Sequence, residues 1–155
     1  MKNLRDGFAN IGSASVAVFL LVLMTAATVA ASENRLSVKV PLANIRSGPG
    51  TDHNVLWKVE KFHPVKVIET RGKWCRFVDF EGDRGWLYRP LLAETETVIV
   101  KKNICNVRSG PGTQHDIVFK TEKGVPYKVL KHEGDWIRIL HVDGDTGWIH
   151  KSLVW

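Results

Sequence analysis

The chain has 155 residues, with 22 Lys and Arg against 16 Asp and Glu, and its formal net charge at pH 7 is +6. This excess favours anionic partners such as cell-wall polymers, lipid headgroups or nucleic acid. The charges are scattered along the sequence rather than clustered, so simple solubility is the alternative explanation. The two Cys and six His are not spaced as a ligand set, so the sequence predicts neither a metal site nor a cofactor.

Residues 1–31 have the three-part pattern of a secretory signal peptide. Lys2 and Arg5 form a basic start, residues 16–31 are almost entirely apolar, and the run ends in small residues. The run is short of the ~20 residues that a spanning helix needs, although an uncleaved anchor is the alternative. We expect cleavage before Ser32 and a periplasmic or secreted protein that meets the membrane only if this segment is retained.

The rest of the chain contains one unit twice. The segment Asn-Ile-Arg-Ser-Gly-Pro-Gly-Thr at 44–51 returns as Asn-Val-Arg-Ser-Gly-Pro-Gly-Thr at 106–113, and the offset of 62 residues holds without a gap. Internal repetition of this kind decides the architecture. It predicts two domains, residues 36–92 and 98–155, joined by a short linker at 93–97 that limits their relative orientation.

Each unit is expected to consist of short strands separated by turns. No window shows the apolar period of 3.6 residues that indicates an amphipathic helix. Apolar and polar residues alternate in runs of about five residues bounded by Gly or Pro, which is typical of a small antiparallel barrel or sandwich. In the first unit, where Pro64 opens the third run, the runs are 36–40, 55–59, 65–69, 74–78 and 85–88.

The two cysteines are predicted to be buried free thiols. In the repeat alignment Cys75 corresponds to Ile137 and Cys105 corresponds to Ala43, so both occupy apolar strand positions in different units. A disulfide would require the two cores to meet. Unoxidised Cys behaves as a small hydrophobic residue, which suits these positions.

The order of motifs resembles the bacterial SH3 domain family. Both units contain Asn-x-Arg-Ser-Gly-Pro-Gly-Thr, then Gly-x-Trp among alternating apolar residues, then Gly-x-x-Gly-Trp and a closing Leu. The resemblance covers nearly the full length of both units. It implies an all-β protein with two tandem SH3-like five-stranded barrels after the signal peptide. In that family such domains are exported accessory modules that often target or modulate cell-wall enzymes, and some bind peptidoglycan.

Two interpretations of the Arg-Ser-Gly-Pro-Gly segment are open. Gly48, Pro49 and Gly50 either offer backbone groups to a ligand or form a tight turn, in which Pro fixes φ and Gly supplies a positive φ. Arg46 and Arg108 either clamp a carboxylate or phosphate of a ligand or bond the carbonyls of their own loop.

The repeated tryptophans form two pairs with different expected roles. Trp86 and Trp148 are expected to pack, because small barrels need large side chains to fill a limited core. Trp74 and Trp136 leave their strands on the face opposite the core residues, and that face is either solvent or a ligand groove. The candidate ligand-binding residues are Arg46, Trp74, Tyr88, Arg108, Trp136 and His150.

No catalytic residue is predicted. The sequence has no nucleophile–base spacing, and two units of about 57 residues leave no length for an additional enzyme domain. We therefore expect an exported, non-enzymatic binding module at the cell envelope that recognises peptidoglycan, a peptide or an envelope protein. The alternative is a structural protein–protein module without a glycan ligand. Nucleic acid is not an expected partner, because the chain has an export signal.

Overall fold

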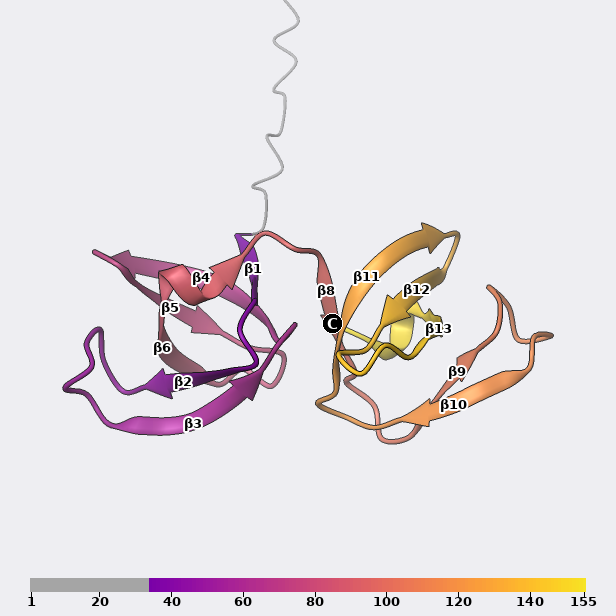
Figure 1. Ribbon diagram of the computed structural model, residues 1–155, viewed down its shortest axis with the longest axis horizontal. Helices are drawn as coiled ribbons and strands as arrows, with labels where there is room; N and C mark the ends of the chain where they lie inside the picture. The colour runs from indigo at the N-terminus through magenta and orange to yellow at the C-terminus, as the bar shows by residue number, and fades with distance from the viewer. Residues whose placement is uncertain (1–33) are drawn as a thin grey trace, which may run out of the picture. The chain divides into compact units, whose positions relative to one another are not determined.

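The computed structural model describes residues 34–155, so the predicted signal peptide lies outside the described residues. Strands and two short 3-10 helices make up the regular structure of this part of the chain (Figure 1). In residues 34–155 no helix is both long and apolar enough to span a bilayer. The expected all-β class is confirmed.

The first unit runs from β1 to β7 and the second from β8 to η2. The elements of the first unit are β1 Arg35–Val38, β2 Leu42–Arg46, β3 Val55–Glu60, β4 Pro64–Arg71, β5 Trp74–Val78, β6 Arg84–Tyr88, η1 Arg89–Leu91 and β7 Leu92–Ala93. Those of the second unit are β8 Thr97–Ile99, β9 Cys105–Arg108, β10 Ile117–Thr121, β11 Pro126–Glu133, β12 Trp136–Leu140, β13 Thr146–His150 and η2 Lys151–Leu153.

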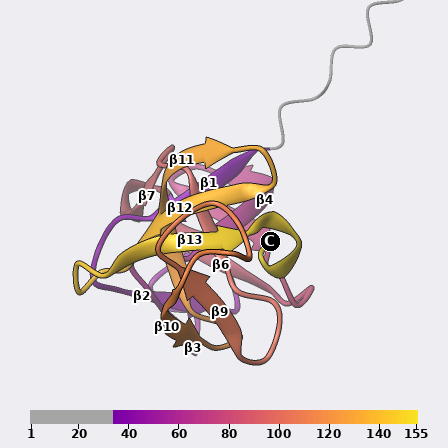
Figure 2. The ribbon, with the colours of Figure 1, turned by 90° about the vertical axis from the view of Figure 1, so that its right-hand side faces the viewer.

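Each unit is one antiparallel sheet. The first sheet has seven strands in the order β3-β2-β6-β5-β4-β1-β7, and the second has six in the order β10-β9-β13-β12-β11-β8. Figure 2 shows β11, β12 and β13 side by side, in agreement with their register. A bridge between Val100 and Val154 replaces, in the second unit, the pairing of β1 with β7 in the first. The two units therefore share one topology.

Every predicted strand run coincides with a strand, but β2 and β7 are additional. The second strand, Leu-Ala-Asn-Ile-Arg, contains two polar residues and one small one, so its apolar alternation is weak in the sequence. The last strand has only two residues and is held by pairing with β1. β2 pairs along its length with β3 and with β6 only at Arg46, and β7 pairs with the distant β1. Local patterns do not report such pairing.

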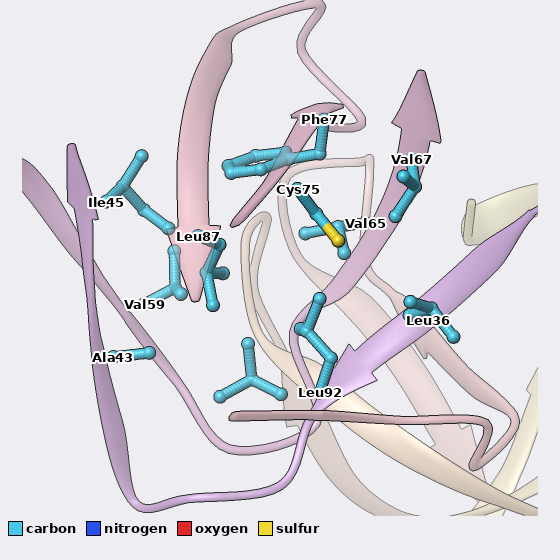
Figure 3. Close-up of a cluster of buried hydrophobic side chains, with 11 residues drawn as sticks. Leu36, Ala43, Ile45, Val59, Val65, Val67, Cys75, Phe77, Leu87 and Leu92 are labelled. Carbon is cyan, nitrogen blue, oxygen red and sulfur yellow. The ribbon is translucent and has the colours of Figure 1, made fainter. Parts of the chain in front are cut away.

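Each unit has its own hydrophobic core. In the first, Ile45, Phe77 and Leu87 are fully buried and converge from three strands (Figure 3). Trp57 packs against this cluster, with its ring edge-on to Phe77 at 6.4 Å between centroids. In the second unit Val107, Ile139 and Ile149 occupy the corresponding centre. Among the described residues, neither cluster includes a residue of the other unit.

At two positions the second core contains a pair of polar side chains where the first core has valines. Tyr127 and Thr121 replace Val65 and Val59, and the hydroxyl of Tyr127 donates to the Thr121 hydroxyl at 2.7 Å. Burial raises the pKa of Tyr127. The two substitutions depend on each other, because a buried hydroxyl without a partner would be unfavourable.

Both cysteines are buried and free, as the repeat alignment predicts. Cys75 lies in the first core cluster and Cys105 in the second. Burial raises the pKa of Cys105, so its reactive thiolate form is disfavoured.

Gly85 and Gly147 allow the two halves of each sheet to meet. At these points β6 passes β2, and β13 passes β9, so closely that an added Cβ would collide with Ile45 and Val107 respectively. Neither glycine has a positive φ, so the requirement is for space rather than for backbone freedom. The Gly-Trp dipeptide of the repeat therefore marks the contact that joins β2 to β6.

Replacing Gly85 with Ala is expected to lower the free energy of unfolding by about 1–3 kcal/mol, because the new methyl group overpacks the contact with Ile45. The Gly85→Ala, Ile45→Ala double-mutant cycle, followed by chemical denaturation, isolates that contact. We expect Ile45→Ala to cost less in the Gly85→Ala background than in the wild type. Strictly additive losses would show that the close approach is not the cause.

His63 is a buried histidine in the turn between β3 and β4. It is 8% exposed, and its Nε2 has no hydrogen-bond partner. Its ring meets Phe80 edge-on at 6.4 Å between centroids. Burial lowers the pKa of His63 from 6.5 to about 4. Its counterpart in the second unit is Val125, so the repeat tolerates an apolar side chain there.

His63 is expected to make the protein less stable as the pH falls from 6.5 towards 4. In this window the unfolded chain binds a proton at His63 that the folded chain does not. The contribution of neutral His63 to the free energy of unfolding is therefore fully present above pH 6.5, and on the order of 3 kcal/mol is lost as the pH falls to 4. His63→Val should flatten this part of the stability profile, measured by urea unfolding at several pH values. An unchanged acid decline in the variant would exclude His63 as its source.

Candidate functional site

The candidate site begins with the alternation of side chains along β2. Ala43 and Ile45 point into the core, while Leu42, Asn44 and Arg46 lie on the opposite face. Leu42 is 53% exposed although it is a large aliphatic residue. Arg46 pairs with Trp86 of β6, so the outward faces of these strands form one surface.

Two aromatic residues extend this surface across β5 and β6. Trp74 and Tyr88 are cross-strand partners, and their ring centroids are 5.4 Å apart with a 53° angle between planes. Both are partly exposed. The prediction that Trp74 leaves its strand opposite Cys75 and Phe77 is confirmed, since these two residues belong to the core.

These residues line a pocket of about 560 Å³ between the Ser47–Asn54 loop and η1. Its floor is β2, and the aromatic pair forms one wall. The lining residues are Leu42, Ala43, Asn44, Arg46, Gly50, Thr51, Asp52, Trp74, Tyr88 and Leu91.

The second unit has a pocket of about 350 Å³ at the corresponding place. Eight repeat positions line both pockets, each 62 residues apart. In the second pocket these positions are Ile104, Cys105, Asn106, Arg108, Thr113, Trp136, His150 and Leu153. The structure thus brings together the sequence-predicted residues as two equivalent groups, one in each unit.

The two pockets differ most at the second aromatic position. Trp136 faces His150, with ring centroids 5.4 Å apart and planes at 82°. The backbone N–H of Ser152 donates to Nδ1 of His150 at 3.3 Å. The same Nδ1 lies 2.7 Å from the Ser152 hydroxyl. The second pocket therefore has an imidazole, fixed by Ser152, where the first has the phenol of Tyr88.

Arg46 and Arg108 hold their own loops closed. Nη1 of Arg46 donates to the carbonyl oxygens of Thr51 and His53, at 3.0 and 2.7 Å. Arg108 donates in the same way to Thr113 and His115, at 3.0 and 2.8 Å. The geometry agrees with the interpretation in which the guanidinium bonds the loop, and the same side chain also lines the pocket.

The glycines of the loop are required for a reason other than the one expected. Neither Gly48 nor Gly50 has a positive φ, so that part of the tight-turn interpretation is wrong. The chain does turn here, since the N–H of Gly50 donates to the carbonyl of Gly48 at 3.0 Å. A Cβ on Gly48 would lie 2.5 Å from the ring of His53, and one on Gly110 would lie 2.6 Å from His115. The imidazole packs directly on the glycine Cα, which gives a role to the one histidine position that both units share.

Trp86 and Trp148 are buried, as predicted, but not in the cores. They are 7% and 9% exposed, and neither belongs to the core clusters of the described residues. Each lies on the outward face of its sheet, where a cation covers its ring. Cζ of Arg71 is 5.3 Å from the ring centroid of Trp86, and Nζ of Lys131 is 5.8 Å from that of Trp148.

Within residues 34–155 there is no group of three or more His, Cys, Asp or Glu side chains placed to hold a metal ion. The pockets instead combine aromatic rings, amide and hydroxyl groups and a fixed guanidinium. Such a surface can stack against a sugar or peptide and hydrogen-bond to its polar groups.

Comparison with known protein families agrees with the division into two repeated units. The model of the bacterial SH3 domain matches residues 39–94 and again residues 101–155. The chain belongs to the bacterial SH3 domain family. The predicted tandem SH3-like architecture is confirmed by these two matches.

The chain spans about a quarter of the length of the curated relative that it matches. YrvJ of Bacillus subtilis (strain 168), named Putative N-acetylmuramoyl-L-alanine amidase, is 25% identical over 141 residues, which is 84% of this chain but 27% of YrvJ. Among solved structures, an NlpC/P60 family protein from Bacillus cereus ATCC 10987 aligns over 78% of this chain and 55% of its own, with 14% identity and a TM-score of 0.38. The Endolysin LysPBC5 CBD aligns over 77% and 90%, with 18% identity and a TM-score of 0.30.

The predicted site residues are three of the ten that line the first pocket and three of the nine that line the second. Leu42 and Asn44 share the outward face of β2 with Arg46, and alternation along that strand would have identified them had the strand been recognised. Thr51 and Leu91 come from the loop and from η1. Their positions depend on how these segments fold over the sheet, which no local pattern reports.

Replacing Arg46 with Ala is expected to lower the free energy of unfolding by about 1–3 kcal/mol, because two carbonyls lose a charged donor. The loop amides of Ser47–Asn54 should also exchange with solvent faster, as measured by hydrogen exchange. Arg84→Ala is the control, since this exposed arginine should change stability by less than about 0.5 kcal/mol. Unchanged exchange in Arg46→Ala would mean that the guanidinium does not hold the loop.

Proposed function

We propose that this protein is an exported, non-enzymatic binding module of the cell envelope whose two SH3 units each bind peptidoglycan through the pocket beside the Arg-Ser-Gly-Pro-Gly loop. The observation that carries the proposal is the repetition of the pocket. Eight equivalent positions line it in both units, including a partly exposed tryptophan next to a second ring. Burial in the core does not explain these rings, because neither belongs to a core cluster of the described residues.

The chemistry of the pocket supports a wall polymer as the ligand. The face of an aromatic ring suits the apolar face of a sugar, and a neighbouring amide and hydroxyl suit its polar groups. Asn44 and Thr51 supply these groups in the first pocket, as Asn106 and Thr113 do in the second. YrvJ, the relative in Bacillus subtilis, is named for an activity on N-acetylmuramoyl-L-alanine, which contains such a sugar and the first residue of its peptide.

Two modest sites on one chain suit a polymeric ligand. When one unit is bound, the other meets the same polymer at a high effective concentration, so that the pair binds more tightly than either site alone. A binding module without catalysis needs no nucleophile. Cys105 lines the second pocket, and burial raises the pKa of its thiol, which disfavours the reactive thiolate.

Removing both pocket tryptophans is expected to abolish most binding to purified sacculi. Trp74→Ala with Trp136→Ala should raise the dissociation constant by about tenfold or more in cosedimentation, because stacking on a ring contributes roughly 1–3 kcal/mol per site. Circular dichroism should show a folded protein, since both rings lie outside the cores. Ile68→Ala with Leu130→Ala is the matched control, because these exposed residues occupy repeat positions outside both pockets.

Two outcomes would contradict the proposal. If the tryptophan variant unfolds while its residual folded fraction binds normally, the rings are structural. If the wild type does not bind sacculi but is retained by an envelope extract, and soluble wall fragments do not compete, the module docks to an envelope protein instead.

A further inference from the structure

A row of cross-strand neighbours runs from the first pocket across the outward face of the sheet. Arg46 of β2 pairs with Trp86 of β6, Trp86 pairs with Arg76 of β5, and Arg76 pairs with Glu69 of β4. Cross-strand partners in an antiparallel sheet point to the same side. Arg71, two residues after Glu69 on β4, extends its guanidinium over the ring of Trp86.

The second unit repeats the row. Arg108 pairs with Trp148, Trp148 pairs with Arg138, and Arg138 pairs with Lys131, whose Nζ lies over the Trp148 ring. The order arginine, tryptophan, arginine is thus kept, with one further cation on the ring. The sequence nearby has changed, since Arg71-Gly72-Lys73 corresponds to Glu133-Gly134-Asp135.

Acidic neighbours compensate only part of this charge. Glu69 forms ion pairs with Arg71 and Arg76, so one carboxylate pairs with two of the three cations around Trp86. In the second unit Lys131 pairs with Glu133 at 2.8 Å. Both groups therefore keep an excess of positive charge.

The cations of the row are accessible to a ligand. The side chains of Arg71 and Arg76 are 63% and 42% exposed, and that of Lys131 is 59% exposed. The buried indole beneath them is a flat support that restricts their motion, so less freedom is lost when an anion binds. Repulsion between these neighbouring positive charges destabilises the unbound protein, and a bound anion relieves that repulsion.

We propose that each row is a subsite for the anionic groups, phosphate or carboxylate, of an extended polymer that also occupies the adjoining pocket. Arg46 and Arg108 belong to both pocket and row, so the two surfaces are continuous. Neighbouring strands are about 4.8 Å apart, which places Arg46 and Arg76 on either side of Trp86 within about 10 Å. This inference rests on the proposed function of the pocket and adds that the polymer bound there carries negative charge.

The test measures binding of two labelled probes, inorganic polyphosphate and poly-L-glutamate, to the purified chain by fluorescence anisotropy. Arg76→Gln with Arg138→Gln is the row variant, because Gln removes the charge and keeps a polar side chain beside the tryptophan. Lys58→Gln with Lys120→Gln is the control, since it removes the same charge at exposed, equivalent positions on β3 and β10. Circular dichroism checks that both variants are folded.

The row variant is expected to raise the dissociation constant for at least one probe by about tenfold or more, and the control by less than about threefold. If only polyphosphate binding depends on the row, the row is a phosphate site. If only poly-L-glutamate binding depends on it, the row is a carboxylate site. If both do, the row accepts either anion. Equal losses in the two variants, or no binding of either probe at low salt, would overturn the proposal.

The same probes separate this inference from the proposed function. Trp74→Ala with Trp136→Ala should leave binding of the polyanions within about threefold of wild type, because these probes bind the row through their charges and carry no sugar to stack on the pocket rings. If sacculi do not bind but the row still determines polyanion binding, only the wall-polymer assignment fails. If sacculi bind and the row is irrelevant, only the anionic subsite fails.

Discussion

The passage of β6 against β2 at Gly85 is the contact on which the rest of each unit depends. With no Cβ at this position, the strands approach until Ile45 fills the space above the glycine. The next residue, Trp86, then lies beside Arg46 on the outward face. One backbone contact therefore completes the wall of the core on one side and positions the pocket and the cationic row on the other. The same contact recurs at Gly147 and Val107 in the second unit.

Arg46 connects this contact to the loop. Its guanidinium uses Nη1 for two carbonyls of the Ser47–Asn54 segment, and His53 packs on Gly48 from the same loop. The loop thereby becomes one side of a pocket that Trp74 and Tyr88 also line. Structural and ligand-facing roles of this arginine do not exclude each other, because a fixed cation is a better ligand for an anion than a freely rotating one.

The sequence was most informative where a residue's role is local or repeated. Alternation located five strands of each unit, the repeat alignment placed both cysteines in cores, and the offset of Trp74 from Cys75 predicted its outward direction. The sequence was least informative about β2, η1 and the loop glycines, whose roles come from side-chain packing and strand pairing that composition and alternation do not report. Trp86 illustrates the limit, since its size correctly indicated burial, but only the register shows that it is buried under cations rather than in the core.

The most direct test of the central claim, that both outward pockets bind wall polymer, is a titration of the ¹⁵N-labelled chain with soluble peptidoglycan fragments, followed through the indole N–H signals. The account predicts that the signals of Trp74 and Trp136 shift together with the side-chain amides of Asn44 and Asn106, while Trp57, packed against the core, does not move. Shifts at Trp57 without shifts at Trp74 and Trp136, or no shifts at saturating fragment, would contradict it.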